Sequence, residues 1–175
     1  MERLTPVVEK FVLHWGEMGT RWGINRTVAQ IHALLFISEK ALNAEEITGL
    51  LGVARSNVSN SLRELQGWGI VRVVHVMGDR RDHFESVKDV WELFRQVLEE
   101  RKKREIDPTV SLLKECVAEA GRAGPADKYP RKKLAELLDF FQTTTTWYEH
   151  VRRLPTSVLM KLVRVGGTLR RIAGG

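Results

Sequence analysis

The spacing of hydrophobic residues predicts two amphipathic helices at the start of the chain. Apolar residues recur every three or four positions between Leu4 and about Met18, as on the buried side of a helix. Three glycines, at positions 16, 19 and 23, then interrupt this pattern. The same spacing resumes after Asn25, a residue type that often caps helix N-termini, and ends near Ser38.

The next segment has the pattern of a helix-turn-helix. In Asn43–Glu46 a capping residue is followed three positions later by Glu, which predicts the start of a short helix that Gly52 ends. A second helix is predicted over Arg55–Leu65, because its aliphatic residues fall on one face. A short helix, a tight turn and a second helix in this order are typical of the motif.

A β-hairpin is predicted directly after these helices. The run Ile70–Val76 is rich in β-branched residues, Met77–Arg81 is a polar turn, and Asp82–Ser86 can return as the second strand. We therefore expect a mainly α fold with a small β-hairpin wing, that is, a winged helix-turn-helix with flanking N- and C-terminal dimerisation helices.

The second half of the chain is predicted to be helical. One long helix is expected from Val87 to about Ala120, bent at Pro108, followed by a loop over Gly121–Pro130. Two further helices are expected, over about 131–154 and 155–172. The predicted division is an N-terminal dimerisation helix (1–24), a winged helix-turn-helix (25–87) and a C-terminal helical dimerisation and effector region (88–175).

The net charge is weak evidence for nucleic-acid binding. The chain carries a formal charge of +6, but after Glu149 it has six basic residues and no acid, so the 22 basic residues before that point balance 22 acidic ones. An apolar stripe along the tail favours a packed helix with basic outer residues over a second DNA contact, a membrane-surface helix or a merely solvated face. The basic residues of the tail are Arg152, Arg153, Lys161, Arg164, Arg170 and Arg171.

The outward face of the second helix is better evidence. It presents amides, hydroxyls and guanidinium groups, and in the major groove Asn pairs with adenine edges and Arg with guanine edges. An ordinary polar helix face and a soluble turn are the alternatives for these positions. Asp79 or Asp82 could orient one wing arginine, and the wing would reach phosphates or the minor groove. The predicted DNA contacts are Arg55, Ser56, Asn57, Ser59, Asn60 and Arg63 of the helix, with Arg80 and Arg81 of the wing.

These residues resemble a known family of regulators. The segments Leu50–Ser59, Leu62–Leu65, Trp68–Val71 and Gly78–Asp82 closely resemble the GbsR-like branch of the MarR superfamily of winged helix-turn-helix transcriptional regulators. The likeness is specific over about residues 25–85. It implies a homodimer whose first and last helices interleave, which binds a palindromic operator and commonly acts as a repressor released by a small-molecule effector.

The chain departs from the branch at two places. Ala54 stands where many relatives have a Ser or Thr that caps the recognition helix, so one phosphate contact is in doubt. The segment Ile31–Leu34 lacks the Gly and Tyr usual in the branch, so ligand contacts made there in relatives are not transferred.

Aromatic residues suggest an effector site near the C-terminus. Related proteins sense choline-like compounds, and stacked rings attract quaternary ammonium groups. Trp15, Trp68 and Trp91 fall at core positions, where tryptophan usually serves packing. The better candidates for effector binding are Phe140, Phe141, Trp147 and Tyr148, for which core packing is the alternative.

Other chemistries find little support in the sequence. The five histidines lack zinc-site spacing, Cys116 is the only cysteine, and no phosphate loop, nucleophile elbow or catalytic carboxylate pair occurs. We predict no catalytic residue, metal or cofactor. An early acid and the lack of a long apolar run predict a cytoplasmic protein without membrane association.

The sequence therefore predicts a homodimer that binds double-stranded DNA sequence-specifically. Two alternatives stay open: a winged-helix protein-interaction module of a larger assembly, and a nucleic-acid-processing enzyme that uses the C-terminal helices.

Overall fold

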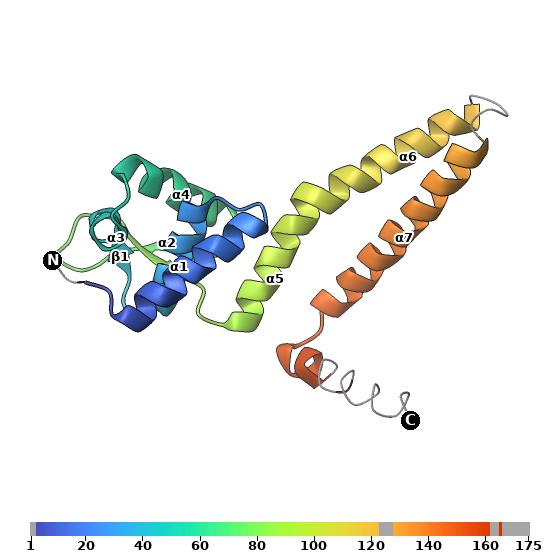
Figure 1. Cartoon of the computed structure of the whole chain (residues 1–175). Helices are drawn as coiled ribbons and strands as arrows, with labels where there is room; N and C mark the ends of the chain where they lie inside the picture. Colours follow the sequence, from blue (N-terminus) through green and yellow to red (C-terminus); the bar gives the residue numbers. More distant parts are fainter. Residues whose placement is uncertain (1–2, 123–127, 162–164, 166–175) are drawn as a thin grey trace. The chain divides into compact units, whose positions relative to one another are not determined.

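The computed structural model describes residues 3–122, 128–161 and 165. The chain divides into two compact units, the first ending at Val97 and the second beginning at Leu98. Each unit is described separately below, and Figure 1 labels the main elements. In chain order the elements are α1 (Pro6–Arg21), α2 (Arg26–Ile37), β1 (Leu42–Asn43), α3 (Ala44–Leu51), α4 (Arg55–Gly67), β2 (Val71–Val74), β3 (His83–Ser86), α5 (Val90–Arg101), the π-helical turn η1 (Lys102–Ile106), α6 (Asp107–Arg122) and α7 (Lys128–Arg152).

The core of the first unit is built around α2. This helix packs against α1, α3, α4 and β3, and seven of its twelve residues are buried. Ile31 and Leu34 of α2 meet Ile47 of α3 and Leu65 of α4 in one cluster of nearly inaccessible aliphatic side chains. The apolar spacing that predicted these helices thus corresponds to one shared core, which holds the outer face of α4 in place.

The first helix is longer than predicted. The glycines at positions 16, 19 and 23 were expected to end it near Met18, yet α1 continues to Arg21. At Gly19 a Cβ atom would lie 2.5 Å from the Cβ of Ala29 in α2, so the absent side chain allows the two helices to cross closely. These helical glycines therefore serve packing rather than termination.

The predicted helix-turn-helix is confirmed in detail. The side chain of Asn43 accepts hydrogen bonds from the backbone N–H groups of Glu45 and Glu46, both at 3.0 Å, and the Glu46 carboxylate accepts from the Asn43 N–H at 2.8 Å. This is the predicted capping box. At the other end of α3, Gly52 has φ of +64°, a left-handed conformation that a side chain would disfavour. It turns the chain directly into α4.

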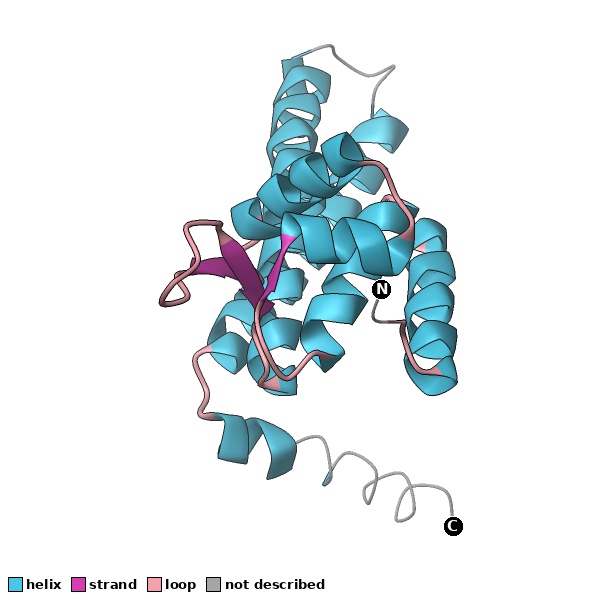
Figure 2. Cartoon of the chain, turned by 90° about the vertical axis from the view of Figure 1, so that its left-hand side faces the viewer, coloured by secondary structure: helices cyan, strands magenta, loops and turns pink. Residues whose placement is uncertain are grey.

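The wing is a three-stranded sheet rather than an isolated hairpin. The strand order is β1-β3-β2, and both pairs of neighbouring strands are antiparallel (Figure 2). Phe84 of the central strand β3 pairs with Leu42 of β1 on one side and with Val73 of β2 on the other. The predicted hairpin is confirmed, but β1 was not predicted because two residues carry no alternation pattern. Through β1 the wing is joined to the residue that caps α3.

The second unit is formed by η1, α6 and α7 with the end of α5. The predicted single bent helix is interrupted just before Pro108, where five residues form the π-helical turn η1. Lys102 in this turn pairs with Asp107 at 3.0 Å and with Glu149 of α7 at 3.5 Å. A third ion pair, between Arg152 and Glu99, measures 2.9 Å. The pairs that involve Glu149 and Arg152 connect the end of α7 to η1 and to the end of α5.

Several predictions for the second half fall partly outside the described residues. The predicted helix over 131–154 is confirmed and begins earlier, at Lys128. Of the helix expected over 155–172, residues 156–161 are helical, and most of the others lie outside the described residues. Residues 123–127 of the expected loop also lie outside the described residues. The division at residues 24 and 87 stays a prediction. None of the helices described has the length and hydropathy required to cross a bilayer.

Candidate nucleic-acid interface

Helix α4 has one buried face and one exposed face. Val58, Ser61, Leu62 and Leu65 are buried against the core of the first unit. The opposite face is open to solvent, because no part of the first unit covers it. It carries all six predicted helix contacts: Arg55, Ser56, Asn57, Ser59, Asn60 and Arg63.

The N-terminus of α4 lacks a side-chain cap. Ala54 occupies the N-cap position and makes no side-chain hydrogen bond, as its residue type requires. The first backbone N–H groups of the helix therefore have no side-chain acceptor from the capping residue. Arg55 is the first residue of the helix and places a cation beside these groups.

The polar face of α4 has an internal contact and continues to one further residue, Gln66. The guanidinium of Arg63 donates a hydrogen bond to the side-chain oxygen of Asn60 at 3.2 Å, one turn away. This contact orients both side chains on the exposed face. Gln66, one turn beyond Arg63, is also exposed and shares this side of the helix, although the sequence analysis did not select it.

The wing turn holds Arg81 in place by hydrogen bonds, whereas Arg80 has no ion pair among the described residues. The Asp79 carboxylate accepts hydrogen bonds from the backbone N–H of Arg81 at 3.0 Å and from its Nε at 2.9 Å. These bonds hold the pKa of Asp79 well below its usual range. Arg80 is exposed and makes no ion pair with any described residue. Of the two acids that could orient an arginine, Asp79 does so for Arg81.

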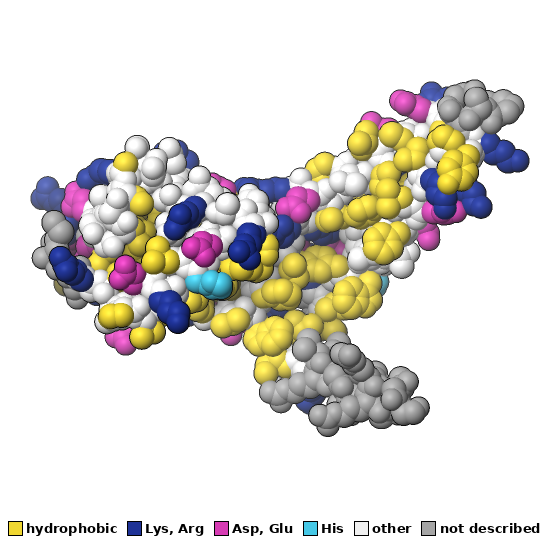
Figure 3. Space-filling model, viewed as in Figure 1, with side chains coloured by type: hydrophobic (Ala, Val, Ile, Leu, Met, Phe, Trp, Pro, Cys, Tyr) yellow, Lys and Arg dark blue, Asp and Glu magenta, His cyan; other side chains and the backbone are white. Residues whose placement is uncertain are grey.

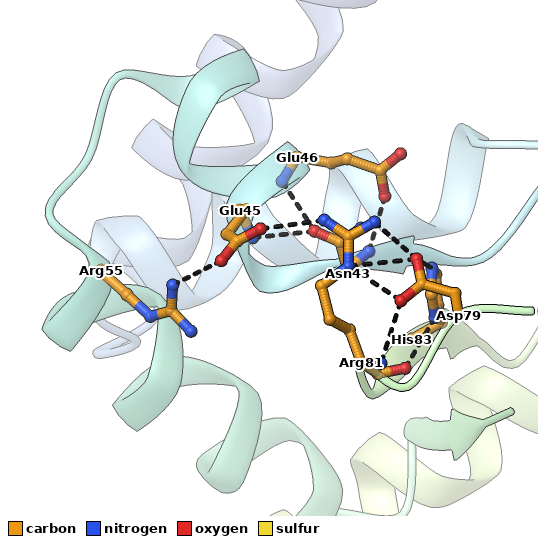
Figure 4. Close-up of polar contacts among 7 residues, drawn as sticks. All are labelled: Asn43, Glu45, Glu46, Arg55, Asp79, Arg81 and His83. Atoms are coloured by element: carbon orange, nitrogen blue, oxygen red, sulfur yellow. Dashed lines mark hydrogen bonds and ion pairs between the residues drawn. The ribbon is translucent and has the colours of Figure 1, made fainter. Parts of the chain in front are cut away.

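Glu45 joins the wing to α4, a link that the sequence analysis missed. Its carboxylate pairs with Arg55 Nη1 at 2.8 Å and with Arg81 Nη1 at 2.9 Å (Figure 4). Hydrogen bonds from Arg55, and then from Arg81, lower the pKa of Glu45. Arg81 lies 36 positions further along the chain, so no local spacing rule could have paired it with Glu45.

The same side chains border a shared hollow. Its volume is about 340 Å³, and it lies between the start of α3, the outer side of α4 and the wing. Polar atoms face it from all three elements. The hollow is lined by Glu45, Arg55, Ser59, Arg63, Gln66, Arg81 and Asp82, among others.

Comparison with known proteins identifies this segment. Residues 22–82 match the family model described as "MarR family". Over these residues the chain is similar to the MarR family, and we refer to them below as the MarR-family domain. The match covers α2 to the wing turn, so it includes every predicted DNA contact. It confirms the superfamily that the sequence resemblance indicated, for this part of the chain.

A solved structure extends the likeness in fold beyond the MarR-family domain. A structure described as a transcriptional regulator is 21% identical, covers 83% of this chain and 99% of its own, and has a TM-score of 0.57. Transcriptional regulator Tm0710 from Thermotoga maritima is also 21% identical, covers 82% of this chain and 90% of its own, and has a TM-score of 0.39. The first likeness shows a shared fold. No match was found among curated proteins.

A second feature of the first unit is an apolar cavity beside the MarR-family core. Its volume is about 250 Å³, and its walls come from α1, α2, the end of α4 and the start of α5. His32 is 6% exposed and its Nε2 atom has no hydrogen-bond partner among the described residues. Burial lowers the pKa of this histidine to about 4, so the ring is neutral at pH 7. The wall includes Trp15, Trp22, Val28, Trp68, Leu93 and Phe94.

The predicted aromatic effector residues all lie on α7, in the second unit. The rings of Phe140 and Phe141 are 5.7 Å apart in an edge-to-face arrangement. Phe140 and Trp147 are 61% and 64% exposed, whereas the hydroxyl of Tyr148 is buried without a hydrogen-bond partner among the described residues. A role for these residues in ligand binding stays a prediction.

Proposed function

We propose that this protein is a transcriptional regulator that binds double-stranded DNA sequence-specifically, as a cytoplasmic homodimer on a pseudo-palindromic operator. The observation that carries the proposal is the exposed face of α4, with six predicted contacts on the helix that a MarR-family domain contributes to DNA recognition. A repressor role and membership of the GbsR-like branch belong to the same proposal and rest on the sequence resemblance.

The chemistry of the α4 face assigns different tasks to its residues. Asn57, Asn60 and Arg63 carry the groups that pair with base edges, and they supply sequence preference. Arg55 and the wing arginines supply affinity through phosphates. In a two-fold dimer the two α4 helices would enter successive major grooves, about one helical turn or roughly 34 Å apart.

The main alternative is a winged-helix module that binds a protein. Such a surface usually has an apolar centre surrounded by polar residues. The described face of α4 instead carries amides, hydroxyls and guanidinium groups, which suit base edges and phosphates. We therefore favour DNA.

Selection of bound duplexes from a random pool at near-physiological salt tests the proposal. We expect enrichment of one motif with two related half-sites whose centres lie about 10 base pairs, or a multiple of that, apart. Retention of duplexes without any enriched motif would contradict sequence-specific binding. Enrichment of a single, unrepeated half-site would contradict the two-fold arrangement.

The surface of the second unit supports the homodimer. Helix α7 has 25 residues, and none of those described is fully buried. Hydrophobic side chains gather over α6 and α7 in Figure 3, and the exposed ones include Leu112, Leu137, Phe140 and Trp147. An exposed apolar surface of this kind marks an interaction site. We propose that a second copy of the chain covers it.

Phe140→Glu is expected to weaken the dimer about tenfold or more, because it places a charge in the apolar surface between subunits. Sedimentation equilibrium of the full chain measures the dissociation constant. Gln142→Glu adds the same charge to an exposed position on another side of α7, and we expect it to leave the dissociation constant of the dimer unchanged. A wild-type monomer, or an unchanged Phe140→Glu dimer, would refute this assignment.

We also propose that a small-molecule effector binds in the apolar cavity beside His32. The walls are almost entirely apolar, and the Nε2 atom of the neutral ring is a buried polar atom without a hydrogen-bond partner among the described residues. The site therefore suits an uncharged, largely apolar compound with one hydroxyl. An anion would lose its hydration without gaining a cationic partner.

Titration with p-cresol and benzoate tests this effector class. Three tryptophans line the cavity, so we expect p-cresol, but not benzoate, to change the intrinsic fluorescence saturably. His32→Leu should weaken p-cresol binding about fivefold, the effect of one lost hydrogen bond. Equal binding of both compounds, or no effect of the substitution, would argue against the proposed site.

A further inference from the structure

The carboxylate of Glu45 occupies a position between two cations of the proposed DNA interface. We call Glu45, Arg55 and Arg81 the Glu45 clasp. The three residues come from the first turn of α3, the first residue of α4 and the wing turn (Figure 4). One oxygen of Glu45 accepts from Arg55 and the other from Arg81. A single acid therefore connects both DNA-facing elements.

The clasp reduces the positive charge available to DNA. The interface has four predicted cationic contacts, and two of them share the Glu45 carboxylate. Arg80 makes no ion pair with a described residue, and Arg63 contacts the neutral Asn60. A phosphate that approached Arg55 or Arg81 would meet the negative charge of Glu45 in the same hollow.

The contacts of the clasp are weak enough to exchange. The side chains of Arg55, Arg81 and Glu45 are 67%, 52% and 51% exposed, and ion pairs at such positions contribute little net stability. A phosphate held by other contacts of a cognate complex can therefore displace Glu45. Arg81 would stay oriented during this exchange, because Asp79 holds its Nε and its backbone N–H independently.

We propose that Glu45 is a specificity-determining residue that competes with DNA phosphates for Arg55 and Arg81. The competition weakens binding to non-cognate DNA more than binding to the operator, where base contacts hold the helix in place. This inference rests on the proposed DNA-binding function. In this proposal Glu45 lowers the affinity of the protein for DNA that lacks the operator sequence.

Glu45→Gln is a suitable test because it should leave the local fold intact. The capping box depends on the side chains of Asn43 and Glu46, and Glu45 contributes only its backbone N–H. Glu17→Gln removes the same charge at an exposed position of α1, outside the clasp, and serves as the matched control. Dissociation constants are measured for the selected duplex and for a scrambled one, between 50 and 200 mM salt.

Glu45→Gln is expected to bind the scrambled duplex more tightly and to lower the ratio of specific to non-specific affinity. Freeing one or two arginines should steepen the salt slope by about 0.9 each, so the loss of affinity between 50 and 200 mM grows about 3- to 12-fold. The control should match the wild type in slope and in ratio. An unchanged slope would overturn the inference, and so would weaker binding to both duplexes, which indicates a purely structural brace.

A second measurement, without DNA, separates failure of the clasp from failure of the proposed function. Nuclear magnetic resonance relaxation of the arginine Nε–H groups should show Arg55 becoming more mobile in Glu45→Gln, while Arg81 stays ordered by Asp79. Equal mobility of Arg55 in both proteins would overturn the clasp even where DNA binding is specific. An intact clasp in a wild-type protein that binds neither duplex would instead overturn DNA binding, and the competition with it.

Discussion

Arg63→Ala is expected to weaken binding to the selected operator duplex by about 1–3 kcal/mol, or roughly 5- to 150-fold. Arg63 lies on the exposed face of α4, held by Asn60, and its guanidinium can donate two hydrogen bonds to one guanine edge. The substitution can remove a base contact only from a duplex that carries the base that Arg63 recognises. The effect on a scrambled duplex should therefore be much smaller, as fluorescence anisotropy at constant salt would show.

Arg21→Ala is the matched control for this experiment. It removes the same charge from an exposed position at the end of α1, and it should weaken binding to both duplexes slightly and equally. Equal losses on cognate and scrambled DNA for Arg63→Ala would show that Arg63 contacts phosphate only. Recognition of bases by α4 would then lose its main support.

His32 is expected to make the protein less stable as the pH falls from about 6.5 towards 4. Burial lowers the pKa of His32 to about 4 in the folded protein, against 6.5 for the free side chain. Below pH 6.5 the unfolded chain therefore binds a proton that the folded protein does not, and unfolding becomes easier. The full shift corresponds to about 3 kcal/mol of unfolding free energy. Urea denaturation at several pH values measures this change.

His32→Leu should remove this part of the pH dependence and make the variant more stable than the wild type at pH 4.5. His75→Gln replaces an exposed histidine and should leave the wild-type profile in place. Because Glu45 and Asp79 also lose stabilising contacts in acid, the informative quantity is the difference between variant and wild type. Parallel profiles of His32→Leu and wild type would show that His32 is not the group responsible.

Features governed by local rules were predictable from the sequence. The capping box at Asn43 needs residues three positions apart, and the two faces of α4 follow from helical periodicity. The missing side-chain cap of α4 was also predictable, because alanine at position 54 has no side-chain acceptor. For this reason all six predicted helix contacts could be placed on the exposed face before the structure was known.

Features formed between distant segments were not predictable. The Glu45 clasp joins positions 45, 55 and 81, and β1 is recognisable only by its pairing with β3. The environment of His32 depends on the four helices that line the cavity beside it. The glycines of α1 were misread for the same reason, since their role depends on the distance to Ala29. Sequence patterns predict elements well and their contacts poorly.

The most direct test of the central claim is cleavage of the selected duplex by an iron–EDTA reagent attached to α4. The reagent is placed through Gln66→Cys in a chain whose own Cys116 is replaced by serine, because Gln66 shares the DNA-facing side without being a predicted contact. The account predicts two localised clusters of strand cuts, one in the major groove of each half-site. Uniform cutting along the duplex, or localised cutting only from Gln142→Cys on α7, would contradict it.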